Sequence, residues 1–310
     1  MLTALLRSLR TGVVTIRYPE EPARIPERFR GAPRARSGSA FDALPAAEIC
    51  PTGAISGGAD PQRYAIDLAR CIRCGRCAEG DAGGAIELAP QGAPEEEGGF
   101  AAAIELGREV EVAGRSRASL VVEICPRGEA ALDTGGPLGG EVGRGADGEV
   151  IALPPAPPPA EVAERIRRTL GRSLQLRHLD SGSCNACDWE LAALLNPVYD
   201  VRRLGVDFVA SPRHADGVIV TGPVTRNLEL AVRRTYEAVP EPRVVIAVGA
   251  CASSGGIVGR SYASAGGVGE ILPVDVFIPG CPPRPEAIIH GILLAVGRVR
   301  AGSQDGSGRP

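Results

Sequence analysis

Cysteines that follow predicted β-strands are the feature that most constrains this chain of 310 residues. Short runs of aliphatic and β-branched residues at 174–179, 244–249 and 274–278 are typical of buried parallel strands. The cysteines that come after these runs are Cys184, Cys187, Cys251 and Cys281. Open α/β sheets bind ligands beyond the carboxyl ends of their strands, so the four thiols are expected to meet at one edge of one sheet.

Four thiols form a complete ligand set for one tetrahedral metal ion or one four-iron cluster. Gly249 and Ala250 precede Cys251, and Gly280 and Pro282 flank Cys281. Small residues let the backbone approach a bulky cofactor closely. A single buried cysteine is usually a small core hydrophobe, but four at successive strand ends predict a metal centre. Zinc and iron–sulfur fit this ligand set equally well.

The alternation of strands and helices predicts the fold class of the second half. Further strands are expected at 206–210 and 217–221, and helices at 188–195, 226–238 and 285–299. A polar-faced helix over 160–170 opens this half. The pattern predicts an α/β domain over residues 160–300, a flavodoxin-like open parallel sheet with helices on both faces.

A second group of cysteines lies in the first half of the chain. Its members are Cys50, which precedes a proline, and the C-x-x-C-x-x-C triad Cys71, Cys74 and Cys77. In bacterial ferredoxins the last cysteine of one run binds the cluster held by the other run. The positions of the second cluster's ligands hold Ala40, Ala43, Ala46 and Asp81. One whole cluster set is therefore kept and one is absent.

Cys125 is the alternative fourth ligand of this first cluster. Glu123-Ile124-Cys125-Pro126 repeats the pattern around Cys50, although Cys50 is preferred because it stands in ferredoxin order just upstream of the triad. Zinc sites generally pair two separated C-x-x-C hooks, so the continuous triad argues against a zinc knuckle.

Composition limits the partners and the compartment. The net charge is −3, with 34 basic residues, all of them arginine, and 37 acidic residues, which gives no field favouring nucleic acid. The chain has nine cysteines, an odd number, and several of them stand in C-x-x-C spacing; without a secretory signal, this points to metal ligands in a reducing compartment.

The chain divides into four predicted segments. Residues 1–132 form a ferredoxin-like α+β domain, 133–159 a Gly/Pro-rich linker, 160–300 the second domain and 301–310 a disordered tail. Apolar residues at helical spacing predict an amphipathic helix near the N-terminus: Leu2, Leu5, Leu6, Leu9 and Val13. This helix is too short to span a membrane; it lies on a membrane, on a partner or on its own domain.

Motifs of the second half carry a family resemblance. They are Gly182-Ser183-Cys184-Asn185-Ala186-Cys187, Ser211-Pro212-Arg213-His214-Ala215-Asp216, Thr221-Gly222-Pro223-Val224-Thr225, Gly249-Ala250-Cys251 and Pro279-Gly280-Cys281-Pro282-Pro283-Arg284-Pro285-Glu286-Ala287. From about 161 to 299 the chain resembles the small subunit of membrane-bound group 4 [NiFe] hydrogenases of the formate hydrogenlyase type, in the superfamily of the complex I 20 kDa subunit. The resemblance implies that the four cysteines hold a [4Fe–4S] cluster proximal to the active site. The complex I version has two adjacent cysteines in the first motif, whereas this chain has the hydrogenase form.

The first half, about residues 1–120, resembles the ferredoxin-like subunit of the same hydrogenase complexes and the complex I subunit that carries two [4Fe–4S] clusters. It departs from that family by the loss of one cluster. The resemblance implies a fusion of two subunits that holds two [4Fe–4S] clusters in total.

Several other residues are candidates for supporting roles. Asp188 and Glu190 either form a proton relay beside the cluster thiols or interact with a helix dipole. Arg213 and Arg284 either donate to cluster sulfurs or form salt bridges at a partner surface. His214 is expected to be an ordinary loop residue.

The resemblance implies an electron-transfer subunit of a membrane-associated [NiFe] hydrogenase-type oxidoreductase, not catalytic alone. Its partners are a large subunit, either nickel–iron or like the complex I 49 kDa subunit, other subunits of a membrane complex and a further iron–sulfur donor subunit, with no nucleic acid. It is expected on the cytoplasmic face of the inner membrane, held there by partners. One alternative is a complex I-like module that reduces quinone or another acceptor; another is a zinc-stabilised scaffold with no redox role.

Overall fold

The computed structural model describes the second half of the chain almost completely and the first half in part. The described residues are 2–17, 30–31, 33–35, 48–57, 64–80, 86–88, 105–106, 110–112, 115–117, 121–124, 130–133, 173–241 and 243–295. The predicted linker after residue 133, the helix at 160–170, the tail at 301–310 and Cys125 lie outside these residues.

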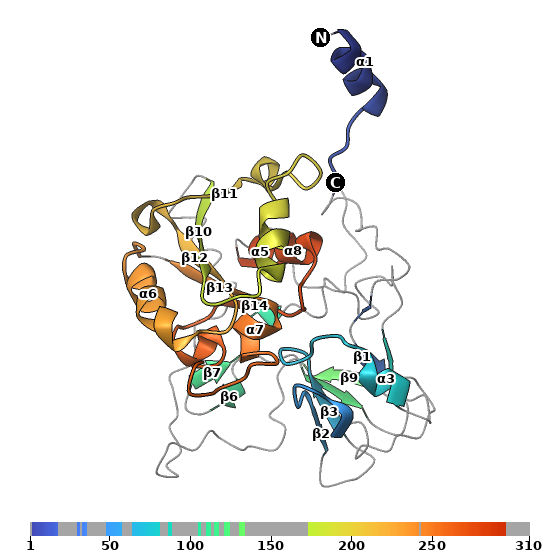
Figure 1. The fold of residues 1–310 in the computed structure, drawn as a ribbon, viewed down its shortest axis with the longest axis vertical. Coiled ribbons are helices and arrows are strands. Elements are labelled where there is room, and N and C mark those ends of the chain that lie inside the picture. The colour runs from blue at the N-terminus through green and yellow to red at the C-terminus, as the bar shows by residue number, and fades with distance from the viewer. Residues whose placement is uncertain are drawn as a thin grey trace, which may run out of the picture.

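A six-stranded sheet forms the centre of the second half (Figure 1). Its order is β11-β10-β12-β13-β14-β5, and the first five strands are parallel. These five are β10 (Leu174–Asp180), β11 (Val206–Phe208), β12 (Gly217–Thr221), β13 (Val244–Val248) and β14 (Val276–Ile278). Counted along the chain, the parallel strands stand in the order 2-1-3-4-5, which is the flavodoxin-like order. The predicted fold class is confirmed.

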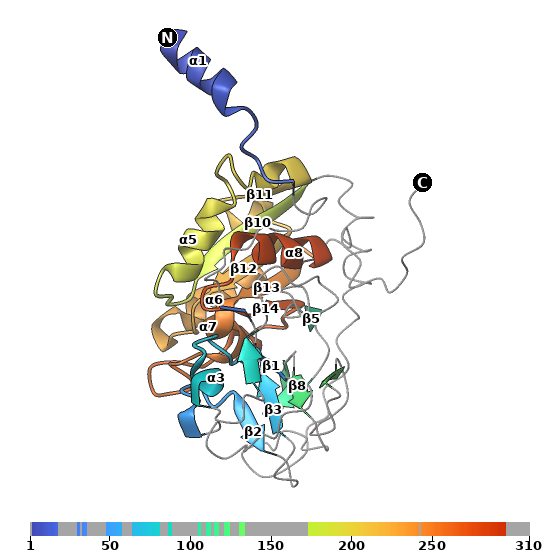
Figure 2. The same ribbon diagram turned by 90° about the vertical axis from the view of Figure 1, so that its right-hand side faces the viewer.

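Helices cover both faces of this sheet (Figures 1 and 2). They are α5 (Ala186–Ala193), α6 (Arg226–Glu237), α7 (Gly249–Ser254) and α8 (Pro285–Ala295). Successive residues of a strand point to opposite faces, so Ile246 packs with α5 and α8 while its neighbour Val245 packs with α6 and α7. All five residues of β12 and of β13 are buried, as expected for central parallel strands.

The short helix α7 and the 3₁₀ turns of the second half were not predicted from the sequence. Helix α7 has the sequence GACASS, which lacks an apolar period, and it begins directly where β13 ends. The 3₁₀ turns η3 (Val201–Leu204), η4 (Pro212–His214) and η5 (Val268–Glu270) were also missed. The strand expected at 274–278 begins only at Val276. These turns are set by contacts between distant segments, which a local pattern does not record.

The described parts of the first half are short strands and two helices. They are α1 (Leu2–Thr11), β1 (Pro33–Ala35), β2 (Ile55–Gly57), β3 (Tyr64–Asp67), α3 (Arg76–Gly80), β4 (Ile86–Leu88), β5 (Glu105–Leu106), β6 (Val110–Val112), β7 (Arg115–Arg117), β8 (Val121–Ile124) and β9 (Ala130–Asp133). Strands β2-β3-β8-β9 form an antiparallel sheet, and β5 joins the edge of the large sheet beside β14. The ferredoxin-like assignment of this half stays a prediction. In both views β1, β3 and α3 lie next to the end of the large sheet that carries α7.

Helix α1 confirms the helix predicted at the N-terminus. It ends before Gly12, whose φ is +66°, and in both figures it projects away from the rest of the described chain. The following segment is fixed to the second half, because Ile16 N–H donates to the carbonyl of Val198 (2.8 Å). Leu9 and Val13 are 71% and 91% exposed. No described helix has the length and apolarity needed to cross a membrane.

Asp275 ties β13 to the start of β14. Its Oδ2 accepts a hydrogen bond from the backbone N–H of Val245 (2.7 Å). Burial raises the pKa of Asp275 to about 6, although the Val245 bond lowers it in part. Since the unfolded carboxyl has the ordinary, lower pKa, the stability that protonation adds is present at acidic pH and is lost as pH rises through about 6.

We expect Asp275→Asn to stabilise the protein at pH 7.5, because the amide keeps an oxygen that accepts from Val245 and carries no buried charge. The gain in free energy of unfolding is at most about 3 kcal/mol, from about two units of pKa shift. It shrinks as pH falls towards 5. Anaerobic urea unfolding of both proteins at pH 5 and pH 7.5 measures it; a gain that does not change with pH contradicts the assignment.

Candidate metal centres

The four cysteines of the second half lie at the carboxyl ends of the parallel strands. Cys184 is in the loop after β10, and Cys187 is in the first turn of α5. Cys251 lies in α7, directly after β13, and Cys281 follows β14. We call these four residues the sheet-edge cage. The sequence predicted this convergence, because parallel strands end at the same edge.

The four thiols of the sheet-edge cage lie close enough to affect one another electrostatically. Burial raises the pKa of Cys187, and the thiols of Cys251, Cys281 and Cys184 raise it further. Burial also raises the pKa of Cys251 to about 11, with added contributions from Cys281 and Cys184. Cys281 has a pKa raised by burial and then by Cys184. The four thiols are thus neighbours, and the three with raised pKa values keep their protons at neutral pH unless metal ions replace them.

Glycines make room around the sulfur atoms. Gly249 has a φ of +90°, and a Cβ added there would lie 2.6 Å from Cys187 Sγ. Gly256 has a φ of +54°, and its added Cβ would lie 2.8 Å from Cys251 Sγ. Real Cβ atoms do not come so close to sulfur, so only glycine fits at both places. This donor set and its glycine walls fit a four-iron cluster with one thiolate on each iron.

A site for a single metal ion needs a tighter arrangement of ligands than a four-iron cluster does. Within the described ranges, no three His, Cys, Asp or Glu side chains are arranged to bind one metal ion. The identity of the metal at the sheet-edge cage stays a proposal.

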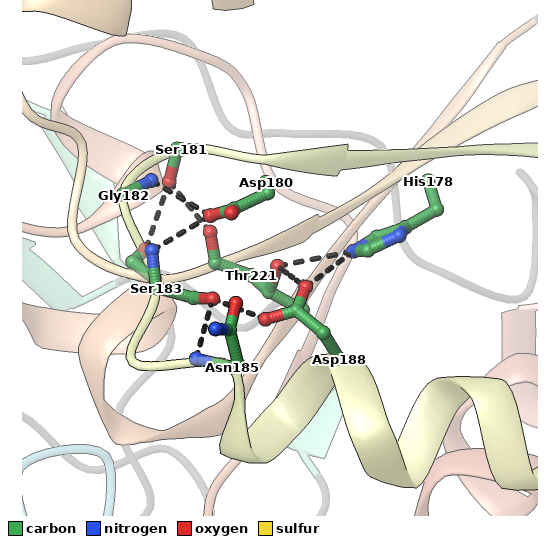
Figure 3. Close-up of polar contacts among 9 residues, drawn as sticks. His178, Asp180, Ser181, Gly182, Ser183, Asn185, Asp188 and Thr221 are labelled. Carbon is green, nitrogen blue, oxygen red and sulfur yellow. Dashed lines mark hydrogen bonds and ion pairs between the residues drawn. The ribbon is translucent and has the colours of Figure 1, made fainter.

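Asp188, next to Cys187, is held by three donors (Figure 3). His178 Nε2 lies 2.9 Å from Asp188 Oδ1, and Thr221 Oγ1 donates to the same oxygen (2.7 Å). Ser183 Oγ donates to Asp188 Oδ2, and Ser183 Oγ also accepts from the backbone N–H of Asn185 (2.9 Å). The carboxylate therefore connects β10, β12 and the C-x-x-C loop, which favours a role in positioning that loop over a proton relay.

His178 acts in this network as a neutral donor. Burial lowers the pKa of His178, and the opposing effects of Asp188 and Asp180 are smaller. The contact with Asp188 is therefore a hydrogen bond rather than a full ion pair at neutral pH. His178 was not predicted as a site residue; its position on a strand six residues before Cys184 was the available signal.

Glu190 and Arg284 belong to a second polar group between α5 and α8. Arg284 Nη2 lies 2.9 Å from Glu286 Oε1, and both side chains are largely buried. Burial raises the pKa of Glu190, and the neighbouring Glu286 raises it further while Arg284 lowers it. The proton-relay role of Glu190 and a contact from Arg284 to cluster sulfur both stay predictions.

The placement of Arg213 favours one of its two predicted roles, the one at a surface. It is exposed in η4, on the connection that leads into the amino end of β12, whereas the cysteines follow the carboxyl ends of the strands. This placement does not support a contact with cluster sulfurs, and a surface role remains. His214, beside it, is exposed as well.

The cysteines of the first half gather around a small hollow that is partly open to solvent. Its lining includes Cys50, Cys71, Cys74 and Cys77 with the apolar side chains of Pro33, Ile66 and Leu88. We call these four cysteines the N-terminal cage. Burial raises the pKa of Cys71 to about 11, and the thiols of Cys77 and Cys50 add to the rise. Cys50 is therefore part of this group, whereas Cys125 lies outside the described residues.

Backbone N–H groups point at the sulfur atoms of the N-terminal cage. Ala54 N–H donates to Cys50 Sγ (3.2 Å), and Arg73 N–H donates to Cys71 Sγ (3.3 Å). Arg73 reaches this geometry with a φ of 54°, in the left-handed region that non-glycine residues seldom adopt. Such donors stabilise negative charge on thiolate and raise the potential of a bound cluster.

Fold and site together define an α/β protein with a four-thiol cage at the carboxyl edge of a flavodoxin-like sheet. Residues 184–295 match the family model described as NADH ubiquinone oxidoreductase, 20 Kd subunit. The chain is 51% identical over 130 residues to the probable membrane-bound hydrogenase subunit mbhJ of Pyrococcus furiosus, covering 42% of this chain and 78% of that protein. It belongs to the 20 kDa subunit family, a family of oxidoreductase subunits.

Two other relatives span both branches of the family. Formate hydrogenlyase subunit 7 of Escherichia coli is 41% identical over 138 residues, which are 44% of this chain and 54% of that protein. An NADH-quinone oxidoreductase subunit of Citrifermentans bemidjiense is 48% identical over 107 residues, 34% of this chain and 62% of the relative. The family match includes every cysteine of the sheet-edge cage.

We expect Gly249→Ala to abolish assembly of the sheet-edge cluster, because the new methyl group meets Cys187 Sγ. The iron content of the purified protein falls by about half. Gly259→Ala is the matched control, since Gly259 also has a positive φ (+61°) but an added Cβ there meets nothing within 4 Å. Equal iron loss in both variants points to backbone strain and contradicts the steric argument.

We expect Thr221→Val to loosen the C-x-x-C loop, because Asp188 loses a buried donor while the side-chain shape is kept. The free energy of unfolding falls by about 1–3 kcal/mol. Thr221→Ser restores the donor and most of the stability. Chemical unfolding of the three proteins measures the difference; a valine variant as stable as the wild type shows that the bond does not hold the loop.

Proposed function

We propose that the chain is the electron-transfer subunit of a membrane-associated group 4 [NiFe] hydrogenase-type complex. In this proposal the N-terminal cage and the sheet-edge cage each hold one [4Fe–4S] cluster. Electrons pass between the two and then to or from the active site in a separate large subunit. The chain is not catalytic alone.

Each cluster supplies the capacity to accept and release one electron at a time. The residues of the chain bind and orient the clusters and shield them from water. Thiolates of Cys184, Cys187, Cys251 and Cys281 bind one cluster, and those of Cys50, Cys71, Cys74 and Cys77 bind the other. The apolar lining and the backbone N–H donors of the N-terminal cage limit access of water and stabilise thiolate charge.

The observation that carries the proposal is the placement of two four-thiol groups next to one another in one chain. Residues of the N-terminal cage loop contact the loop that precedes Cys281 and the helix that carries Cys251. A zinc scaffold needs no such proximity, whereas electron transfer does, because tunnelling rates fall steeply with distance. The C-x-x-C form of the first motif and the resemblance to hydrogenase small subunits favour a nickel–iron partner.

The edge of the sheet also offers a surface for the large subunit. Trp189, next to Cys187 and Asp188, is 75% exposed, and Ile257 after Cys251 is 63% exposed. Exposed apolar side chains beside the cage are typical of an interaction surface. We propose that the large subunit covers them, with further subunits holding the complex on the cytoplasmic face of the inner membrane.

A complex I-like module is the second candidate. The family description and the 48% identity to an NADH-quinone oxidoreductase subunit favour it. In that case the large subunit lacks nickel, resembles the 49 kDa subunit and reduces quinone or another acceptor. Co-purification with the large subunit, followed by nickel analysis and an assay of hydrogen oxidation, separates the two candidates.

We expect the anaerobically purified chain to contain iron and sulfide for two clusters and to show two EPR signals after dithionite reduction. Cys50→Ser removes the signal of the N-terminal cluster, because Cys50 lies in its cage. Cys125→Ser, the matched control, leaves both signals in place. Stoichiometric zinc with silent EPR rejects the electron-transfer proposal in favour of the scaffold. Loss of a signal only in Cys125→Ser reassigns the fourth ligand.

A further inference from the structure

Two hydrogen bonds connect the loops of the two cages. Arg73, between Cys71 and Cys74, donates from Nη2 to the carbonyl oxygen of Pro279 (3.4 Å). Pro279 stands two residues before Cys281. In the opposite direction, Ser254 donates from Oγ to the carbonyl oxygen of Ala69 (2.9 Å).

The two bonds are reciprocal in their placement. Ser254 ends α7 three residues after Cys251, and Ala69 lies two residues before Cys71. Each cage thus provides one side-chain donor and one backbone acceptor to the other. The contacts join positions 206 and 185 residues apart in sequence.

Each donor has a local reason for its position. The left-handed backbone of Arg73 (φ 54°) turns its N–H towards Cys71 Sγ while the side chain crosses to the other cage. The Ser254 hydroxyl has a single proton, which it shares between Ala69 and its own helix, since the carbonyl of Ala250 is 3.0 Å away. Ala250 N–H in turn donates to Gly280 (2.7 Å), so α7 and the Cys281 loop move as one unit.

Arg73 also places a positive charge between the cages. Its side chain is partly buried; burial lowers its pKa, and the Cys71 thiol partly offsets this, but an arginine stays charged. Charges interact more strongly in such surroundings than in water. A cation that contacts both loops stabilises the added negative charge when either cluster is reduced.

We propose that Arg73 and Ser254 form a bridge that fixes the two cages against each other, and that Arg73 is a positioning residue for electron transfer between them. The electron-transfer part rests on the proposed function. The transfer itself moves one electron from the reduced cluster of one cage to the oxidised cluster of the other, with no bond made or broken. The mechanical part, that these two bonds hold the loops together, stands without it.

The experiment compares Arg73→Asn, Ser254→Ala and the double variant in the full chain with the wild type. Asparagine tolerates the left-handed backbone at position 73 and removes the guanidinium. Arg76→Asn is the matched control, because Arg76 is an exposed arginine three residues further along, at the start of α3, and no hydrogen bond from it to the second half is seen among the described residues. Hydrogen–deuterium exchange of the peptides that contain residues 69–74 and 279–281 reports on the bridge itself.

We expect exchange in both peptides to rise about tenfold in Arg73→Asn, the effect of losing one hydrogen bond from a charged group. Ser254→Ala has a smaller effect, and the double variant deviates from additivity because the bonds support one another. EPR shows a weaker magnetic interaction between the two reduced clusters, and both midpoint potentials fall more than in Arg76→Asn.

The outcomes separate the two levels of the proposal. Unchanged exchange in Arg73→Asn and Ser254→Ala overturns the bridge while the two-cluster function stands. Increased exchange in a protein that contains zinc and no iron supports the bridge and overturns its role in electron transfer. Equal potential shifts in Arg73→Asn and Arg76→Asn show that the charge acts only at long range and overturn the positioning role of Arg73.

Discussion

The parallel register of β10, β12, β13 and β14 decides where the chemistry of this chain lies. Each strand pairs with its neighbour in the same direction, so the loops that follow them open at one edge. Cysteines follow three of these strands, whereas β12 ends with Thr221 and Gly222 begins the loop after it. An added Cβ at Gly222 would lie 2.5 Å from the backbone nitrogen of Ser183, so this loop packs directly against the C-x-x-C segment. Buried backbone pairing therefore brings together thiols that are far apart in sequence, and no disulfide is needed to hold them there.

The gathering of four thiols at this edge is unfavourable in free energy unless a metal centre binds there. Burial raises the pKa of three of the four thiols, those of Cys187, Cys251 and Cys281, and the neighbouring thiols raise each of them further. In the proposed cluster, iron ions would displace the protons and balance the charge, which would couple formation of the cluster to ordering of the loops. The hydrogen bonds of Asp188 with His178 and Thr221 already restrict the C-x-x-C loop, so the loop loses less conformational entropy when a metal centre binds (Figure 3). This is the physical reason to read Asp188 as a positioning group first.

Much of this arrangement could be predicted from the sequence, and the rest could not for identifiable reasons. Continuous aliphatic runs predicted the strands, and strand polarity then predicted the edge at which Cys251 and Cys281 meet. For Arg213 the sequence left two roles open, and its position just before β12, at the amino end of the strand, favours the role at a surface. His178 was missed because a lone histidine on a strand has no local signature; only the return of α5 beside β10 brings Asp188 to it. The contact of Arg73 with Pro279 is equally non-local.

The presence of both cages in one chain fixes their ratio but does not by itself fix the distance between them. That distance depends on the surfaces that meet, and here both acceptors are backbone carbonyls, of Ala69 and Pro279, which survive most substitutions. The identity of only two side chains, the donors Arg73 and Ser254, therefore decides whether these two hydrogen bonds form. Arg73 lies within the cysteine triad and Ser254 lies three residues after Cys251, so a shift in either donor also shifts a thiol. A mutation at Arg73 or Ser254 is consequently expected to change both the distance between the cages and the positions of the cysteines within them.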